Sequence, residues 1–162
     1  MKTDKNRAAE CWSSSLKINC MLFFLVFAVS VAKAQIGFDT LAQQMQKEKK
    51  YIVMSVGTKS CVYCLMQEKK MRKDEALKKR LADEVYYLSW KQDEQHNFWF
   101  NNREYTTGEQ FTDQYGKDEK GFIAFPLWMI FDPEYKVIYR YTGLLSPEKI
   151  EKILNAIRSE NQ

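Results

Sequence analysis

The sequence lacks a long apolar run, a marked charge imbalance and a set of metal-binding side chains. Its longest apolar run, residues 21–32, is roughly half the ~20 residues that a membrane-spanning helix requires. Most of the formal net charge of +4 comes from residues 1–34, so the rest of the chain gives no sign of a nucleic-acid-binding surface. With His96 as the single histidine, a four-ligand zinc site is also disfavoured, and no metal or other cofactor is expected.

An N-terminal leader is the first positive feature. Basic residues precede the apolar run, and small residues close it at an Ala-Lys-Ala sequence ending at Ala34, which is typical of a secretory signal peptide. We therefore predict a signal peptide at 1–34, one domain at 35–162, and a periplasmic or secreted location. The polar stretch before the apolar run is long, which leaves two alternatives open: translation from Met21, or an uncleaved anchor.

Cys61 and Cys64 form a C-x-x-C sequence and are the only cysteines of the predicted mature chain. In an oxidising compartment such a pair is either a redox centre or one small disulfide. A disulfide across two residues constrains the unfolded chain little, which favours redox chemistry. A strand-like run precedes Cys61 and helix-forming residues follow it, so Cys61 should open a helix, where free N–H groups stabilise a thiolate. We predict Cys61 as the nucleophile and Cys64 as the resolving cysteine.

The remaining pattern predicts alternating helices and strands. Asp39 is a candidate N-cap of the first helix, and Ser146 and Pro147 begin the last one. Parallel strands joined by a helix, then an antiparallel hairpin and a closing helix, predict an α/β fold with a mixed sheet covered on both faces. Helices are predicted at 36–50, 61–81, 108–115 and 147–157, and strands at 51–56, 85–90, 127–131 and 136–141.

The segment 91–115, after the second strand, is predicted as an insert. Asn101 and Asn102 are suited to the turn of a hairpin. The aromatic residues 98–100 either bind a partner or pack onto the domain, and packing is the simpler interpretation. His96 lies in this polar segment and is predicted as a solvated loop residue rather than a catalytic one.

The sequence of residues 121–131, Gly-Phe-Ile-Ala-Phe-Pro-Leu-Trp-Met-Ile-Phe, followed by a turn, a strand and Gly143, resembles the C-terminal half of thioredoxin. With the C-x-x-C, the resemblance extends over residues 51–157. It implies the thioredoxin fold, with a central mixed sheet flanked by helices and an insert after the second strand. It also implies that Pro126 is a cis-proline opposite the cysteines, and that the backbone of Phe125 pairs with the substrate chain.

Three positions depart from the thioredoxin pattern. Ser60 stands where a tryptophan usually precedes the first cysteine, and Ser55 stands where thioredoxins carry a buried acid. The dipeptide between the cysteines, Val62 and Tyr63, lacks the histidine of strongly oxidising relatives, which implies a less oxidising centre. Because of its place between the cysteines, Tyr63 is expected to be exposed and to touch substrate.

The resemblance implies an exported thiol–disulfide oxidoreductase. The chain resembles the thioredoxin-like C-terminal domain of membrane thiol reductases. This resemblance implies exported proteins with thiols or disulfides and a membrane electron donor as partners, and no nucleic acid. A second class stays open: a thioredoxin-fold adaptor that binds a partner while Cys61 and Cys64 remain a redox-idle disulfide.

Overall fold

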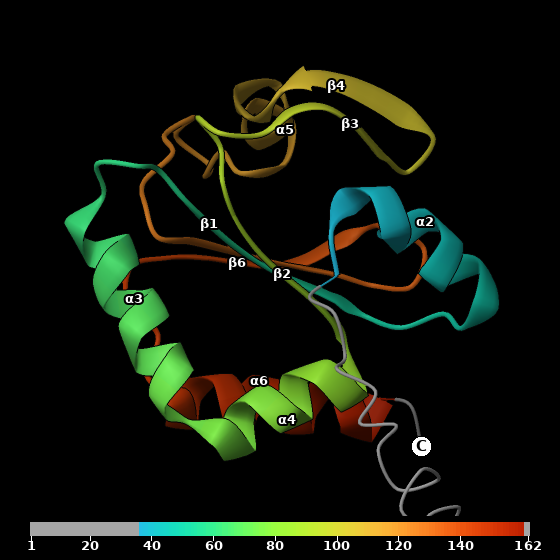
Figure 1. The fold of residues 1–162 in the computed structure, drawn as a ribbon, viewed down its shortest axis with the longest axis vertical. Helices are drawn as coiled ribbons and strands as arrows, with labels where there is room; N and C mark the ends of the chain where they lie inside the picture. Colours follow the sequence, from blue (N-terminus) through green and yellow to red (C-terminus); the bar gives the residue numbers. More distant parts are fainter. Residues whose placement is uncertain (1–35, 161–162) are drawn as a thin grey trace, which may run out of the picture. The chain divides into compact units, whose positions relative to one another are not determined.

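A four-stranded mixed sheet lies at the centre of residues 36–160, the part of the chain that the computed structural model describes (Figure 1). The strand order is β2-β1-β5-β6, with β1 parallel to β2 and the other two pairs antiparallel. The predicted leader at 1–34 lies outside the described residues and stays a prediction. The strands are β1 (Ile52–Gly57), β2 (Tyr86–Lys91), β5 (Leu127–Phe131) and β6 (Val137–Thr142).

Helices cover both faces of this sheet, as predicted (Figure 1). One face carries α3 (Val62–Lys73), α4 (Glu75–Glu84) and α6 (Pro147–Glu160), and the other carries α2 (Phe38–Lys47) and α5 (Gly108–Tyr115). Alternate side chains of β1 supply the two cores, because successive residues of a strand point to opposite faces. Within residues 36–160, no helix is long and apolar enough to cross a membrane.

The predicted insert after the second strand is a separate antiparallel hairpin, β3 (His96–Phe100) and β4 (Arg103–Thr107). Asn101 and Asn102 form its turn with φ values of 49° and 58°. Asparagine tolerates this left-handed backbone better than most residues, and two such residues in a row make a tight hairpin turn. The turn predicted at these two residues is confirmed.

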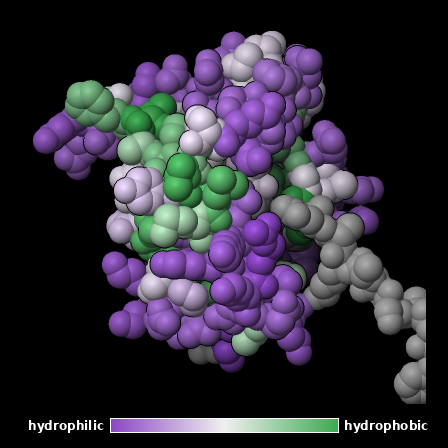
Figure 2. All heavy atoms as spheres, turned by 60° about the vertical axis from the view of Figure 1, so that its left-hand side comes forward, coloured by the Kyte–Doolittle hydropathy of each residue, from purple (hydrophilic) through white to green (hydrophobic). Residues whose placement is uncertain are grey.

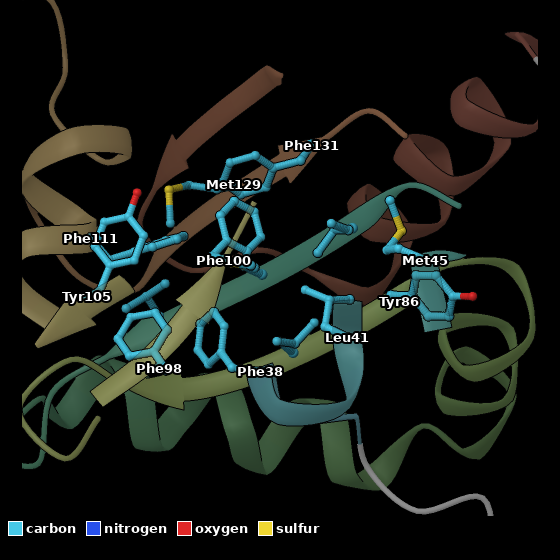
Figure 3. Close-up of a cluster of buried hydrophobic side chains, with 14 of the residues drawn as sticks. Phe38, Leu41, Met45, Tyr86, Phe98, Phe100, Tyr105, Phe111, Met129 and Phe131 are labelled. Carbon is cyan, nitrogen blue, oxygen red and sulfur yellow. The ribbon is translucent and has the colours of Figure 1, made fainter. Parts of the chain in front are cut away.

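The hairpin packs onto the sheet through aromatic side chains (Figure 3). Phe98 and Phe100 are buried, and the rings of Phe98 and Phe38 lie 4.2 Å apart between centroids. The packing interpretation is therefore confirmed for these two residues. Trp99 is different, since it points away from this core and is 56% exposed.

One long helix over 61–81 was the prediction, and this is wrong. The segment contains two helices, because Asp74 ends α3 and caps α4: its Oδ1 accepts the Leu77 N–H at 2.9 Å. Aspartate is among the best N-cap residues, so the chain can start a new helix there without glycine or proline.

The ends of the first and last helices also test the predicted caps. Asp39 is not the N-cap of α2; it lies in the first turn, and Gly37 holds the cap position, with its N–H bonded to the Thr40 hydroxyl at 3.3 Å. At the other end of the chain, α6 begins at Pro147, and the Ser146 hydroxyl accepts the Lys149 N–H at 3.4 Å, as the sequence predicts.

Candidate active site at the Cys61–Cys64 pair

Cys61 is the N-cap of α3, directly after the loop that follows β1. Its carbonyl oxygen accepts the N–H groups of Cys64 and Leu65 at 3.1 and 3.2 Å. Its Sγ accepts the Cys64 N–H at 3.1 Å. A hydrogen bond at the positive end of a helix stabilises negative charge on the acceptor, so this position favours the thiolate form of a reduced Cys61.

Cys64 lies one turn into α3 and is disulfide-bonded to Cys61, with the two Sγ atoms 2.08 Å apart. The two cysteines differ in exposure: Cys61 is half-buried, whereas Cys64 is only 5% exposed. An approaching sulfur atom therefore meets Cys61 first, while Cys64 is shielded behind it.

Gly57, the last residue of β1, provides the space that Cys64 occupies. A Cβ atom on Gly57 would lie 3.0 Å from both the Cβ and the Sγ of Cys64. Any larger residue would therefore push α3 or the disulfide away from the sheet. The strand predicted at 51–56 stops one residue before Gly57, and the contact of Gly57 with the cysteine was not predicted.

The peptide bond between Phe125 and Pro126 is cis, as the resemblance implies. Pro126 is buried, and its carbonyl oxygen accepts the Gly143 N–H at 2.8 Å. Gly143 has a φ of 113°, which glycine adopts readily and other residues rarely do. Phe125 is half-buried against the aromatic core.

The strand register brings Pro126 to the cysteine pair. Val56 of β1 pairs with Leu127 of β5 in an antiparallel register. Gly57 follows Val56 and Pro126 precedes Leu127, so both residues lie at this end of the strand pair, and Gly57 is close to Cys64. The two motifs, 62 residues apart in the sequence, thus meet at one end of the sheet.

Comparison with known protein families matches residues 38–158 to the thioredoxin-like domain. The chain belongs to this family. Similar solved structures include the DsbH oxidoreductase, with 13% identity and a TM-score of 0.54 over 80% of this chain and 89% of that chain. The exposed lipoprotein thioredoxin of Streptococcus pneumoniae has 14% identity and a TM-score of 0.50 over 69% and 89%. No curated protein matches the chain by sequence.

These findings confirm the predicted thioredoxin fold. A third similar structure, chloroplastic thioredoxin z, has 13% identity and a TM-score of 0.51 over 76% of this chain and 92% of that chain. At such identities the likeness to solved structures shows the fold alone. The thioredoxin-like fold with a disulfide-bonded C-x-x-C is the arrangement expected of a thiol–disulfide oxidoreductase.

In this thioredoxin-like domain, the side chains around the disulfide are open to solvent. Tyr63 is 63% exposed, as predicted for a residue between the cysteines. Val62, Leu65 and Met66 of α3 and Phe122 of the loop before the cis-proline are exposed as well. The exposed side chains at the start of α3 are therefore mostly apolar.

Gln67 ties the helix that carries the cysteines to the loop before α6. Its side-chain amide donates to the Leu145 carbonyl at 3.0 Å and accepts the Leu145 N–H at 2.8 Å, and it is fully buried. Gln67 lies three residues after Cys64 on the same buried side of α3. A polar residue on this apolar side was the signal available in the sequence, and the prediction missed it.

Hydroxyl groups stand where the resemblance implies a buried acid. Ser55 is buried and pairs with Ser89 across β1 and β2. Burial raises the pKa of the neighbouring Tyr87 phenol to about 12, and this outweighs the opposite effect of its hydrogen bonds to Ser89 and Ser55. These groups are neutral at neutral pH, so Ser55 supplies no carboxylate to accept a proton.

His96 begins β3 rather than lying in a loop, although its side chain is exposed as predicted. It pairs with Thr107 at the end of the hairpin. Among the described residues, no three His, Cys, Asp or Glu side chains are grouped in a way that could hold a metal ion.

Proposed function

We propose that the chain is an exported thiol–disulfide oxidoreductase in which Cys61 is the nucleophile and Cys64 resolves the mixed disulfide. The observation that carries the proposal is the unequal exposure of the two sulfurs at the start of α3. The half-buried Cys61 accepts a hydrogen bond that favours its thiolate, and the shielded Cys64 is within bonding distance of Cys61.

The reaction begins with both cysteines reduced. The Cys61 thiolate attacks one sulfur of a substrate disulfide, a Cys61–substrate bond forms, and the other substrate sulfur leaves as a thiolate that takes a proton from solvent. Cys64 then loses its proton to solvent and attacks the Cys61 Sγ, which releases the second substrate thiol and forms the Cys61–Cys64 disulfide. Two electrons pass to the substrate, so a dithiol donor must reduce the pair again before the next cycle.

Phe125, Pro126 and Tyr63 are the proposed substrate-binding residues. Within residues 36–160, neither the N–H nor the carbonyl oxygen of Phe125 has a hydrogen-bond partner. Free backbone groups beside a buried cis-proline are suited to pairing with an extended polypeptide. Tyr63 offers an exposed ring next to Cys61.

Export is supported by the leader pattern and by the similar lipoprotein, which is described as exposed on its bacterium. The proposed partners are exported proteins with thiols or disulfides, and a membrane dithiol as the electron donor. The redox-idle adaptor is the competing function, and no observation in the structure favours it.

Trapping of mixed disulfides tests the proposal. The protein would carry Cys11→Ser and Cys20→Ser, so that only the pair remains, and would be reduced and mixed with a disulfide-bonded peptide. Cys64→Ser should accumulate a mixed disulfide at Cys61, detected by mass spectrometry, whereas Cys61→Ser should form none. If Cys64→Ser traps nothing and Cys61→Ser still binds an isolated partner, the adaptor replaces the enzyme.

Equilibration with graded thiol–disulfide buffers would give the reduction potential of the Cys61–Cys64 pair and so indicate the direction of the reaction. A reduction potential near about −270 mV would mark a reductant that depends on the membrane donor. A value of about −180 to −120 mV would instead mark an isomerase or oxidant.

A further inference from the structure

Exposed apolar side chains gather beside the disulfide. Eight large apolar side chains are exposed within residues 36–160, and half of them lie at 62–66, at the start of α3. Figure 2 shows apolar side chains collected on the face that includes the α3 side of the molecule. Exposed apolar groups of this kind mark interaction surfaces.

The outward face of α3 changes from apolar to basic along its length. With 3.6 residues per turn, one line on the helix surface lies opposite the buried Cys64. Four exposed residues form this line: Val62, Met66, Lys69 and Lys73. We call these residues, with the adjacent Tyr63, Leu65, Lys70 and Arg72, the α3 strip.

The basic half of the strip has few acidic neighbours, and one of them is Glu148 of α6, which interacts with Lys70. Glu68 is the single carboxylate of α3. Lys69, Arg72 and Lys73 form no ion pair within residues 36–160. Their charge is therefore available to a ligand.

On the neighbouring helix α4, two of the three cations form ion pairs within residues 36–160 and Lys79 does not. Lys78 pairs with Glu75 at 2.9 Å, and Arg80 pairs with Glu84 at 2.8 Å. Alternating charges of this kind are typical of a solvated helix face. Within residues 36–160 the cations of α3 form no such pairs, and they lie on the helix that begins at Cys61.

We infer that the α3 strip selects substrate polypeptides whose reacting cysteine has apolar neighbours and, further along the chain, acidic residues. This inference rests on the proposed function and names its substrate class. Apolar side chains of the substrate contact Val62, Leu65 and Met66, and carboxylates pair with Lys69 and Lys73.

The dimensions of the strip fix the spacing that the substrate needs. Lys69 and Lys73 follow Cys61 by eight and twelve residues, which corresponds to about 12 and 18 Å along a helix. An extended polypeptide covers about 3.3 Å per residue, so the carboxylates fall roughly four to six positions from the substrate cysteine.

Synthetic peptides with one cysteine bonded to thionitrobenzoate test the inference. Reduced Cys64→Ser protein, with Cys11→Ser and Cys20→Ser, attacks the peptide sulfur and releases coloured thionitrobenzoate as the Cys61–peptide bond forms. Each peptide carries apolar residues beside its cysteine and either two Glu or two Lys four to six positions away. Both orientations are made, with the charged residues either before or after the cysteine. The Glu peptide of one orientation should react about tenfold faster than its Lys counterpart at low salt, and the preference should largely disappear at 1 M salt.

Matched double variants separate the strip from net charge. Lys69→Glu with Lys73→Glu should reverse the preference, whereas Lys79→Glu with Lys152→Glu, exposed positions on α4 and α6, should keep it. Equal rates for Glu and Lys peptides, or equal effects of the two double variants, would overturn the inference.

Two further outcomes are distinguishable. If no peptide forms a bond to Cys61, the proposed function itself fails. If the peptides show no preference while Lys69→Glu with Lys73→Glu abolishes binding to vesicles of anionic phospholipid, the strip contacts a membrane surface and the polypeptide assignment is wrong.

Discussion

The two faces of the sheet are built from different side chains. The face covered by α2, α5 and the β3–β4 hairpin is aromatic, and its rings contact one another in a continuous cluster (Figure 3). The face covered by α3, α4 and α6 is mostly aliphatic and carries the disulfide. We infer that the aromatic face mainly holds the domain together, while the aliphatic face positions a reactive helix whose outer side stays open. The following predictions test that division.

Phe111→Ala should have the largest effect. Phe111 is fully buried and contacts the rings of Phe38, Phe98 and Phe100. Removing such a ring leaves a cavity and should lower the free energy of unfolding by about 3–5 kcal/mol in denaturant titrations. Trp99→Ala on the adjacent β3–β4 hairpin is the control and should change the free energy of unfolding by less than about 0.5 kcal/mol, because its ring is exposed. Equal effects would contradict the assignment of the aromatic face to stability.

Gln67→Leu should have the next largest effect, on the other face. The change leaves the N–H and carbonyl oxygen of Leu145 buried without partners, which should lower the free energy of unfolding by about 1–3 kcal/mol. It should also slow resolution by Cys64, because α3 loses its tie to the loop before α6. Gln43→Leu on the exposed side of α2 should change neither quantity. An unchanged rate of resolution would show that Gln67 is structural only.

Gly57→Ala should act on stability and chemistry together. The new Cβ would lie 3.0 Å from the Cys64 Sγ, so the helix must shift, with a loss of about 1–3 kcal/mol. We expect slower closure of the Cys61–Cys64 disulfide after mixed-disulfide formation, followed by rapid quenching and mass spectrometry. Gly37→Ala, with nothing within 4 Å of its added Cβ, is the control for the chemistry and should leave the rate of disulfide closure unchanged. Disulfide closure at the wild-type rate in Gly57→Ala would refute the role given to this contact.

The smallest expected effect concerns Tyr87 on the aliphatic face and the free energy of unfolding at alkaline pH. Burial raises the pKa of Tyr87 to about 12, whereas an unfolded tyrosine titrates near about 10. The contribution of Tyr87 to the free energy of unfolding is therefore complete below about pH 10. It is lost as the pH rises from about 10 to 12, because over this range only the unfolded state releases the proton. Tyr87→Phe should make the fall in unfolding free energy over this range shallower. Identical pH profiles for the variant and the wild type would mean that Tyr87 ionises alike in both states.

Local patterns in the sequence predicted much of the fold. The strand at 127–131 has the observed bounds, and the Asn101–Asn102 turn and the Pro147 helix start are where the residue types place them. The break at Asp74 was missed because an aspartate inside a helix-forming run looks like another exposed helical residue. Its capping role depends on the direction the chain takes after α3.

The same distinction applies to the candidate site, where local sequence patterns predicted some features and missed others. Cys61 at a helix start follows from a strand, a loop and a helix pattern within a few residues of one another, and the cis-proline followed from a resemblance over a short segment. No local sequence pattern predicted the contact of Gly57 with Cys64 or the hydrogen bonds of Gln67 with Leu145.

The sequence by itself therefore determined the order of the strands, the cysteine pair and its place at the start of a helix, because these depend on neighbours along the chain. Only the tertiary structure set Gly57 against Cys64, brought Pro126 to the same end of the sheet, and bonded Gln67 to Leu145 across 78 positions. It also decided which side of α3 faces solvent, and hence which apolar and basic side chains a partner can reach. The physical reason is that packing and strand register join residues that are far apart in sequence, and such contacts leave little trace in local composition.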